Sequence, residues 1–179
     1  MQRIENYDAI QATSGEFMKP QAGGYVCKIV DAEDVPLDAA TGKGDYIRIN
    51  YDISEGQFAG FYKDQFDKWG GSWSATFVRS YKEKARGMFK HFTNCVEASN
   101  ANYKWDFDEL SLIGKDVGLV LGEEEYRNAA GEAKTKLVVK FVKTVDEIRN
   151  GDFKVPEIQK LAEEPKMEFK PIDDDSIPF

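Results

Sequence analysis

Residues 45–53 read Asp-Tyr-Ile-Arg-Ile-Asn-Tyr-Asp-Ile, and their side chains alternate cleanly along the segment. Because successive side chains of a β-strand point to opposite faces of a sheet, this alternation predicts a strand with one buried face. The side chains expected to face the core are those of Ile47, Ile49, Tyr51 and Ile53. The side chains expected to face outward are those of Tyr46, Arg48, Asn50 and Asp52.

The sequence around this strand has the patterns of a mainly β domain. Apolar runs and alternation predict four more strands, at residues 25–31, 58–66, 115–127 and 133–145. For the last two, the expected inner side chains are Val117, Leu119 and Leu121, and then Leu137, Val139 and Phe141. The first three strands are expected to pair as an antiparallel meander.

Two helices and a long loop are also expected. Residues 81–98 have apolar side chains at helical spacing. These side chains are Ala85, Met88, Phe89, Phe92 and Val96. Residues 69–77, which are rich in glycine and aromatic residues, are expected to form a long loop, and residues 155–162 a last short helix.

The length of 179 residues and the hydrophobic content of 41% predict one well-filled domain. We expect an N-terminal arm at residues 1–22, a domain at residues 23–162 and a disordered acidic tail at residues 163–179. Three strands, a helix and two more strands are the element order of the OB-fold. This fold is a five-stranded Greek-key barrel with its helix between strands three and four.

The formal net charge of −8 at first argues against a nucleic-acid binder, because such affinity comes largely from neutralised phosphates. Half of this charge lies in residues 163–179, which contain six acidic side chains and two lysines. By contrast, the stretch from Lys63 to Lys90 contains seven basic side chains and three acidic ones. Residues 134–143 contain four lysines and no acidic residue. Both stretches are candidate phosphate-binding tracks.

Aromatic residues are interleaved with basic ones between residues 58 and 86, as a protein needs if it stacks on bases and binds phosphates. Trp73, Phe77 and Tyr81 are the preferred stacking residues, because they lie in or beside a Gly/Ser-rich connector where burial is harder. For each ring, burial in the core remains the alternative. The candidate DNA-binding residues are Tyr46, Arg48, Phe61, Lys63, Trp73, Phe77, Arg79, Tyr81, Lys82, Arg86, Lys134 and Lys136.

The sequence ends in Asp-Asp-Asp-Ser-Ile-Pro-Phe, an anionic cluster followed by an apolar plug. A basic-rimmed hydrophobic pocket on another protein would accept this combination. The candidate partner-binding residues are Asp173, Asp174, Asp175, Ile177, Pro178 and Phe179. A tail that only improves solubility is the alternative interpretation.

This ending resembles the C-terminal tip of bacterial single-stranded DNA-binding proteins, although Ser176 here separates the aspartates from Ile-Pro-Phe. The body resembles a group of phage and prophage single-stranded DNA-binding proteins. The similar segments are a Pro-x-Ala-Gly-Gly-Tyr start at residues 20–25 and a Trp-Gly-Gly to Ser-Tyr-Lys-x-Lys-Ala connector at residues 69–85.

The resemblance implies a protein without enzymatic activity that coats and protects single-stranded DNA in replication or recombination. It also implies that the tip recruits replication, recombination or repair enzymes in the cytoplasm of a bacterial host cell. Many relatives form dimers or tetramers, so a homo-oligomer is one option. Neither a cofactor nor a metal is expected, and no segment has the apolar run of a membrane span.

Other function classes have weaker support. An OB-like adaptor or a DNA-mimicking protein is the main alternative, because of the net acidic charge. A metal-dependent nuclease would rest on scattered acidic residues, namely Asp31, Glu33, Asp34, Asp52 and Glu55. Gly42-Lys43-Gly44 lacks the spacing of a phosphate-binding P-loop. Cys27 and Cys95 form no CxxC pair, and His91 with Cys95 has no further ligand at a metal-binding spacing.

Overall fold

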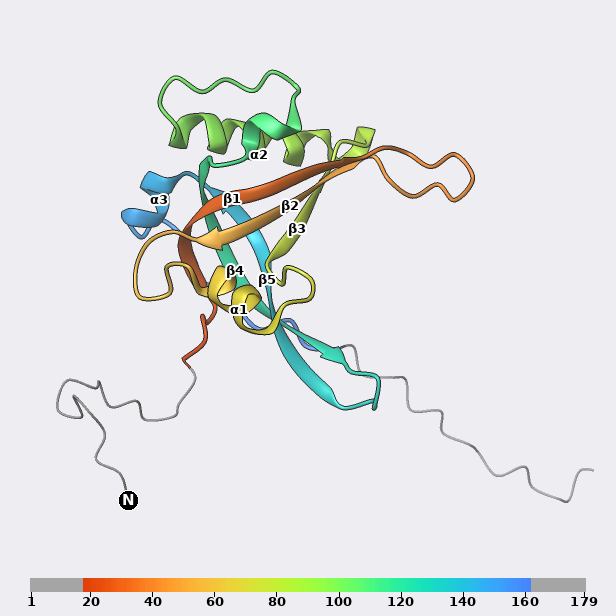
Figure 1. Ribbon diagram of the computed structural model, residues 1–179, viewed down its shortest axis with the longest axis vertical. Coiled ribbons are helices and arrows are strands. Elements are labelled where there is room, and N and C mark those ends of the chain that lie inside the picture. The colour runs from red at the N-terminus through yellow and green to blue at the C-terminus, as the bar shows by residue number, and fades with distance from the viewer. Residues whose placement is uncertain (1–17, 162–179) are drawn as a thin grey trace, which may run out of the picture.

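The computed structural model describes residues 18–161, which form a mainly β structure with three helices (Figure 1). The strands are β1 (Gly23–Val35), β2 (Tyr46–Ile53), β3 (Thr76–Ser80), β4 (Asp116–Arg127) and β5 (Ala133–Lys143). The helices are α1 (Phe61–Trp69), α2 (Arg86–Ser99) and α3 (Val145–Arg149), with single 3-10 turns at Glu83–Ala85 and Glu109–Leu112.

The five strands form one antiparallel sheet in the order β3-β2-β1-β4-β5. The first three strands pair consecutively as a meander and a helix lies between the third and fourth strands, as predicted, although the third strand is formed by other residues than expected. Strands β3 and β5 are the two edges of the sheet. The β4–β5 hairpin extends past α1, and α2 lies at the other end of the sheet, as Figure 1 shows.

The prediction of a third strand at residues 58–66 is wrong, because α1 occupies Phe61–Trp69. The third strand instead lies at Thr76–Ser80, inside and beyond the expected loop, where Phe77 pairs with Ile49. Aromatic side chains at residues 58–66 suggested a strand, since they are common in sheets. The same aromatic side chains also recur at helical spacing. In addition, the carboxylate of Asp52 stabilises the first turn of the helix, because it accepts the N–H groups of Tyr62 and Lys63.

The core-facing side of β2 is confirmed, because Ile47, Ile49, Tyr51 and Ile53 are all buried. Asp52 was expected to face outward but is buried under the first turn of α1. Backbone N–H groups, including those of Ile53 and Lys63, donate to its carboxylate oxygens, and these hydrogen bonds explain how the carboxylate is tolerated in a buried position.

The inner face of β4 is also confirmed, since Val117, Leu119 and Leu121 are buried in the main core. The helix prediction holds for α2, which begins at Arg86 after the 3-10 turn and buries Phe92 and Val96. Met88 was expected on the packed face but is 63% exposed.

In β5, Leu137 and Val139 pack against the core as expected, but Phe141 is 54% exposed. The register of β4 with β5 shifts between Val120 and Leu121, which are opposite Phe141 and Val139 respectively. A bulge of this kind moves the following side chains to the other face, so Val142 is buried in place of Phe141.

The last short helix is not at residues 155–162: residues 155–161 form no helix, and α3 lies earlier, directly after β5. It begins with a capping box in which Thr144 and Glu147 bind each other's backbone N–H. Val145 and Ile148 of helix α3 pack with Val26 and Val120 of the sheet in a small second core.

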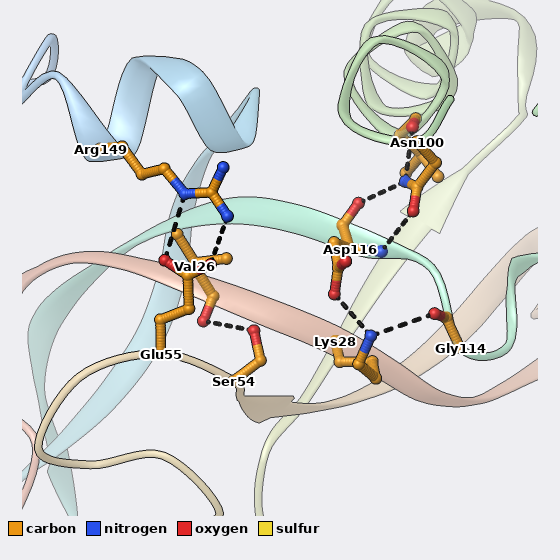
Figure 2. Close-up of polar contacts among 9 residues, drawn as sticks. Val26, Lys28, Ser54, Glu55, Asn100, Gly114, Asp116 and Arg149 are labelled. Atoms are coloured by element: carbon orange, nitrogen blue, oxygen red, sulfur yellow. Dashed lines mark hydrogen bonds and ion pairs between the residues drawn. The ribbon is translucent and has the colours of Figure 1, made fainter. Parts of the chain in front are cut away.

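Polar contacts tie the ends of these elements to the sheet (Figure 2). At the end of α2, the amide of Asn100 donates to the carbonyl of Asp116 at 2.8 Å, and its oxygen accepts the N–H of Asp116 at 3.0 Å. Lys28 forms an ion pair with the Asp116 carboxylate at 2.7 Å. Arg149 of α3 pairs with Glu55 after β2. None of the helices within residues 18–161 has the length and apolar character needed to cross a membrane.

Candidate nucleic-acid interface

Aromatic side chains gather around α1, in a set that we call the α1 aromatic cluster. Its members are Tyr25, Tyr51, Phe58, Phe61, Tyr62, Phe66, Trp69 and Trp73. Most neighbours meet edge to face, with ring centroids 5.3 Å apart for Phe61 and Tyr62. Phe66 and Trp69 are 41% and 65% exposed, so part of the cluster faces solvent.

Three predicted DNA-binding residues belong to this region, namely Phe61, Lys63 and Trp73. Trp73 is only half-buried: its Nε1 donates to the carbonyl of Tyr51 at 2.9 Å, and its ring lies 5.6 Å from that of Phe66. Lys63 is exposed and pairs with Asp67 at 2.5 Å. The hydrogen bond to Asp67 raises the pKa of the Lys63 ammonium, which therefore stays charged.

An open groove of about 930 Å³ lies between α1 and β5. Its aromatic lining comes from the α1 aromatic cluster, through Tyr25, Tyr51, Phe58, Phe61 and Tyr62. Thr76 of β3, the Thr135–Leu137 stretch of β5 and residues 18–22 also line it. The predicted residues Phe61 and Lys136 therefore belong to one cavity, although they are far apart in the sequence.

A second group of predicted residues lies at the far end of β3. Tyr46 pairs with Ser80, and Arg48 with Val78, on the outward face of β2 and β3. Arg48 donates to the carboxylate of Glu33 at 2.6 Å, so its charge is offset by a neighbour on β1. The half-buried ring of Tyr46 is thus beside a neutralised cation.

Phe77 and Arg79 point to the inner side of β3. Phe77 is buried at 7% exposure, and the expectation that the connector would keep its ring accessible is wrong, because β3 forms there and pairs it with Ile49. The guanidinium of Arg79 lies 4.8 Å from the centre of the Phe77 ring. Arg79 forms no ion pair within residues 18–161, and burial lowers the pKa of its guanidinium.

Tyr81, Lys82 and Arg86 follow β3 directly. The hydroxyl of Tyr81 donates to Asp34 at 2.7 Å, and burial together with this contact raises the pKa of the phenol to about 12. Lys82 reaches the carbonyl of Gly42 in the β1–β2 connection, and Arg86 donates to the carbonyl of Tyr81. Both cations bind carbonyls rather than carboxylates, so their charges are not cancelled in these contacts.

Lys134 and Lys136 are exposed on the β4–β5 hairpin. Lys136 lies 5.7 Å from the centre of the Tyr126 ring, and Lys134 lies 3.8 Å from the carboxylate of Glu132. Lys136 lines the groove, whereas Lys134 is not among the lining residues. Lys140, on the same strand, donates to the side-chain oxygen of Gln159 at 2.6 Å.

The structure thus divides the predicted residues into two groups at opposite ends of β3. One group lies around α1 and the groove, and the other lies where β3 leads to α2. A strand of five residues places these ends roughly 13 Å apart. Sequence reasoning left Tyr25, Phe58 and Tyr62 out of the candidate residues, and it placed Tyr51 in the core, where Tyr51 is indeed buried. The helical spacing of Phe58, Phe61, Tyr62 and Trp69 was the available signal for an aromatic cluster.

Two candidate chemical groupings of the sequence can be compared with the structure, namely a metal-ligand cluster and the pair of His91 and Cys95. No three His, Cys, Asp or Glu side chains within residues 18–161 come together as metal ligands. The Nε2 of His91 lies 3.0 Å from the carbonyl of Val142 and 3.5 Å from the Sγ of Cys95. Burial raises the pKa of the Cys95 thiol to about 11, so this sulfur stays protonated and is a poor nucleophile.

The predicted partner-binding residues of the tip, Asp173 to Phe179, lie outside the described residues. The sequence matches no model of a known protein family and no curated protein.

Proposed function

We propose that the chain binds single-stranded DNA without catalysing a reaction, and that it coats and protects exposed strands in replication or recombination. The observation that carries the proposal is the exposure of Phe66 and Trp69 beside the exposed Lys68 on α1. Large exposed aromatic rings are unfavourable in water unless a ligand covers them. Unpaired bases are flat and stack on such rings, while lysines bind the phosphates between them.

The fold supports this proposal. We infer an OB-type barrel from the strand order, because joining β3 to β5 would close the sheet β3-β2-β1-β4-β5 into a ring. Barrels of this type bind oligonucleotides on a surface formed by strands and their connecting loops. The helix between β3 and β4 agrees with the same arrangement.

We further propose that the acidic tip recruits replication, recombination or repair enzymes while the body holds the strand. Half of the net charge of −8 lies in residues 163–179, a part that need not touch DNA. This division explains how an acidic protein can bind an anion. The resemblance to phage and prophage proteins suggests the cytoplasm of a bacterial host cell as the compartment, and a homo-oligomer as one assembly.

An equilibrium titration followed by fluorescence anisotropy tests the proposal. Labelled oligo-dT should bind tightly, and a duplex of the same length weakly. The Trp69→Ala variant should lose about 5- to 150-fold in affinity for oligo-dT, which corresponds to the 1–3 kcal/mol of one stacked base. Phe107→Ala is the matched control, since Phe107 is 85% exposed in the connection between α2 and β4.

A wild-type chain that binds neither oligo-dT nor other single strands would refute the proposed function. The second candidate, an adaptor or DNA mimic, is favoured by the three consecutive acidic side chains Glu123, Glu124 and Glu125 on β4. A DNA mimic would bind no oligonucleotide in this titration, and it would displace DNA from a DNA-binding enzyme instead.

A further inference from the structure

Both edge strands of the sheet contribute to the lining of the groove. Thr76, the first residue of β3, and Thr135, near the start of β5, are among its lining residues. The groove therefore occupies the seam at which a closed barrel would join β3 to β5. We call it the seam groove. Its volume of about 930 Å³ is near the upper end of the 300–1,000 Å³ typical of ligand pockets.

The lining of the seam groove suits nucleobases. Tyr25, Tyr51, Phe58, Phe61 and Tyr62 supply aromatic rings along it. Amide and hydroxyl side chains lie among these rings and can donate to or accept from the edges of bases. They are Gln57, Gln65, Ser74 and Thr135, of which Ser74 donates to Gln65 at 3.3 Å. A neutral, flat ligand with hydrogen-bonding edges matches both kinds of side chain.

The groove carries little charge for its size. Lys19, Lys136 and Glu123 are the ionisable side chains besides its tyrosines. Burial raises the pKa of Tyr51 and raises that of Tyr62 to about 12, so both phenols are neutral at physiological pH. Phosphates would gain little from the interior of the groove, and the two lysines offer them partners on its walls.

The outward face of β2 and β3 is the competing path for a DNA strand. It offers the ring of Tyr46, but Arg48 on this face is paired with Glu33. The Asn50 amide lies 3.4 Å from Asp31, and its oxygen accepts from Thr76 at 2.7 Å. This face has fewer rings than the seam groove, and the charge of its arginine is offset by a carboxylate.

On the basis of the proposed function, we propose that the seam groove is the nucleobase site. Bases of a single strand enter between α1 and the β4–β5 hairpin and stack on Phe58 and Phe61. The phosphates stay at the rim, near Lys19 and Lys136. The strand therefore passes through the open seam of the sheet rather than across the outward face of β2 and β3.

Two tryptophan substitutions at edge strands separate these paths. Thr135→Trp fills the seam groove from β5, whereas Val78→Trp adds the same bulk to the outward face of β3, where Val78 is 49% exposed. Strands tolerate tryptophan well, and both positions are solvent-accessible. We expect Thr135→Trp to weaken oligo-dT binding by about tenfold or more, and Val78→Trp to leave it nearly unchanged.

Photocrosslinking of the wild-type chain provides a readout that does not depend on how a variant folds. Oligo-dT carrying 5-iodouracil should crosslink to Tyr25, Phe58 or Phe61, identified by mass spectrometry of the peptides. Crosslinks at Tyr46 instead, or a loss of affinity only in Val78→Trp, would overturn the assignment of the seam groove as the nucleobase site. The proposed function would still hold in that case. Unchanged DNA affinity in Thr135→Trp would assign the groove to another occupant, such as a polypeptide strand. Failure of the wild-type chain to bind any oligonucleotide would overturn both proposals.

Discussion

The indole Nε1 of Trp73 donates a hydrogen bond of 2.9 Å to the backbone carbonyl of Tyr51. This bond fastens the connector between α1 and β3 to the middle strand of the three-strand meander. It also fixes the orientation of a ring that contacts Phe66. Trp73 is thus an anchor of the α1 aromatic cluster as well as a candidate stacking residue.

Replacing Trp73 with phenylalanine should keep much of the apolar contact but remove this hydrogen bond. We expect the free energy of unfolding to fall by about 0.5–1.5 kcal/mol, because one half-buried hydrogen bond is lost. Trp73→Ala should lower it further and should also weaken oligo-dT binding. Urea denaturation and anisotropy measure the two effects. Equal DNA affinity for Trp73→Ala and the wild-type chain would show that Trp73 acts only as an anchor.

The buried carboxylate of Asp52 should matter for both stability and binding. It accepts the N–H groups of Tyr62 at 3.0 Å and Lys63 at 3.2 Å, which would otherwise lack partners in the first turn of α1. Asp52→Ala should cost about 1–3 kcal/mol of unfolding free energy. It should also weaken oligo-dT binding, because α1 carries the exposed rings. Asp64→Ala, at an exposed acid in the same turn, is the control and should cost less than about 0.5 kcal/mol.

Arg79 should contribute to the salt dependence of binding. Its guanidinium has no carboxylate partner within residues 18–161, whereas that of Arg48 is paired with Glu33. Arg79→Ala should weaken oligo-dT binding and reduce the slope of log affinity against log salt by about 0.7, the value for one phosphate contact on a single strand. Arg48→Ala should change the slope less. The same slope in Arg79→Ala and wild type would mean that Arg79 meets no phosphate.

Stability should decline at high pH. The pKa of Tyr62 in the folded state is raised to about 12 by burial, and those of Tyr25 and Tyr51 are also raised, while an unfolded tyrosine has a pKa of about 10. Above pH 10 the unfolded chain therefore loses protons that the folded chain retains. Each such phenol lowers the free energy of unfolding by up to about 1.4 kcal/mol per pH unit, and below pH 9 it contributes no pH dependence.

Urea denaturation at several pH values measures this slope, and Tyr62→Phe should reduce it between pH 10 and 12. An identical slope in the variant and the wild-type chain would contradict the assignment to Tyr62.

Removing residues 173–179 should leave binding of oligo-dT intact. If the acidic tip competes with DNA for the cationic surface, the truncated chain should bind more tightly at low salt and equally at high salt, because salt screens the competition. Anisotropy across a salt series measures this difference. Loss of strand binding in the truncated chain would contradict the division of roles between body and tip, and equal affinity at every salt concentration would exclude the competition.

Much of the sheet could be predicted from local patterns. The alternation at Ile47, Ile49 and Tyr51 and the apolar face of β4 lead directly to buried positions. The candidate site was predicted less well. Phe61, Lys63, Trp73 and Lys136 do lie around the α1 aromatic cluster and the seam groove, but Phe77 is in the core. Local spacing at Phe58 to Phe66 is compatible with a strand or a helix, and it could not decide between them.

By itself, the sequence determined the alternating strands, the placement of α2 between the third and fourth strands, and the segregation of acidic charge into residues 163–179. The tertiary structure decided that residues 61–69 form a helix, since the carboxylate of Asp52 on β2 accepts an N–H group from its first turn. It also decided that a bulge exposes Phe141, and that Thr76 and Thr135 line one groove. The reason is physical: periodicity records which side chains share a face, whereas caps, bulges and grooves depend on groups brought together from distant parts of the chain.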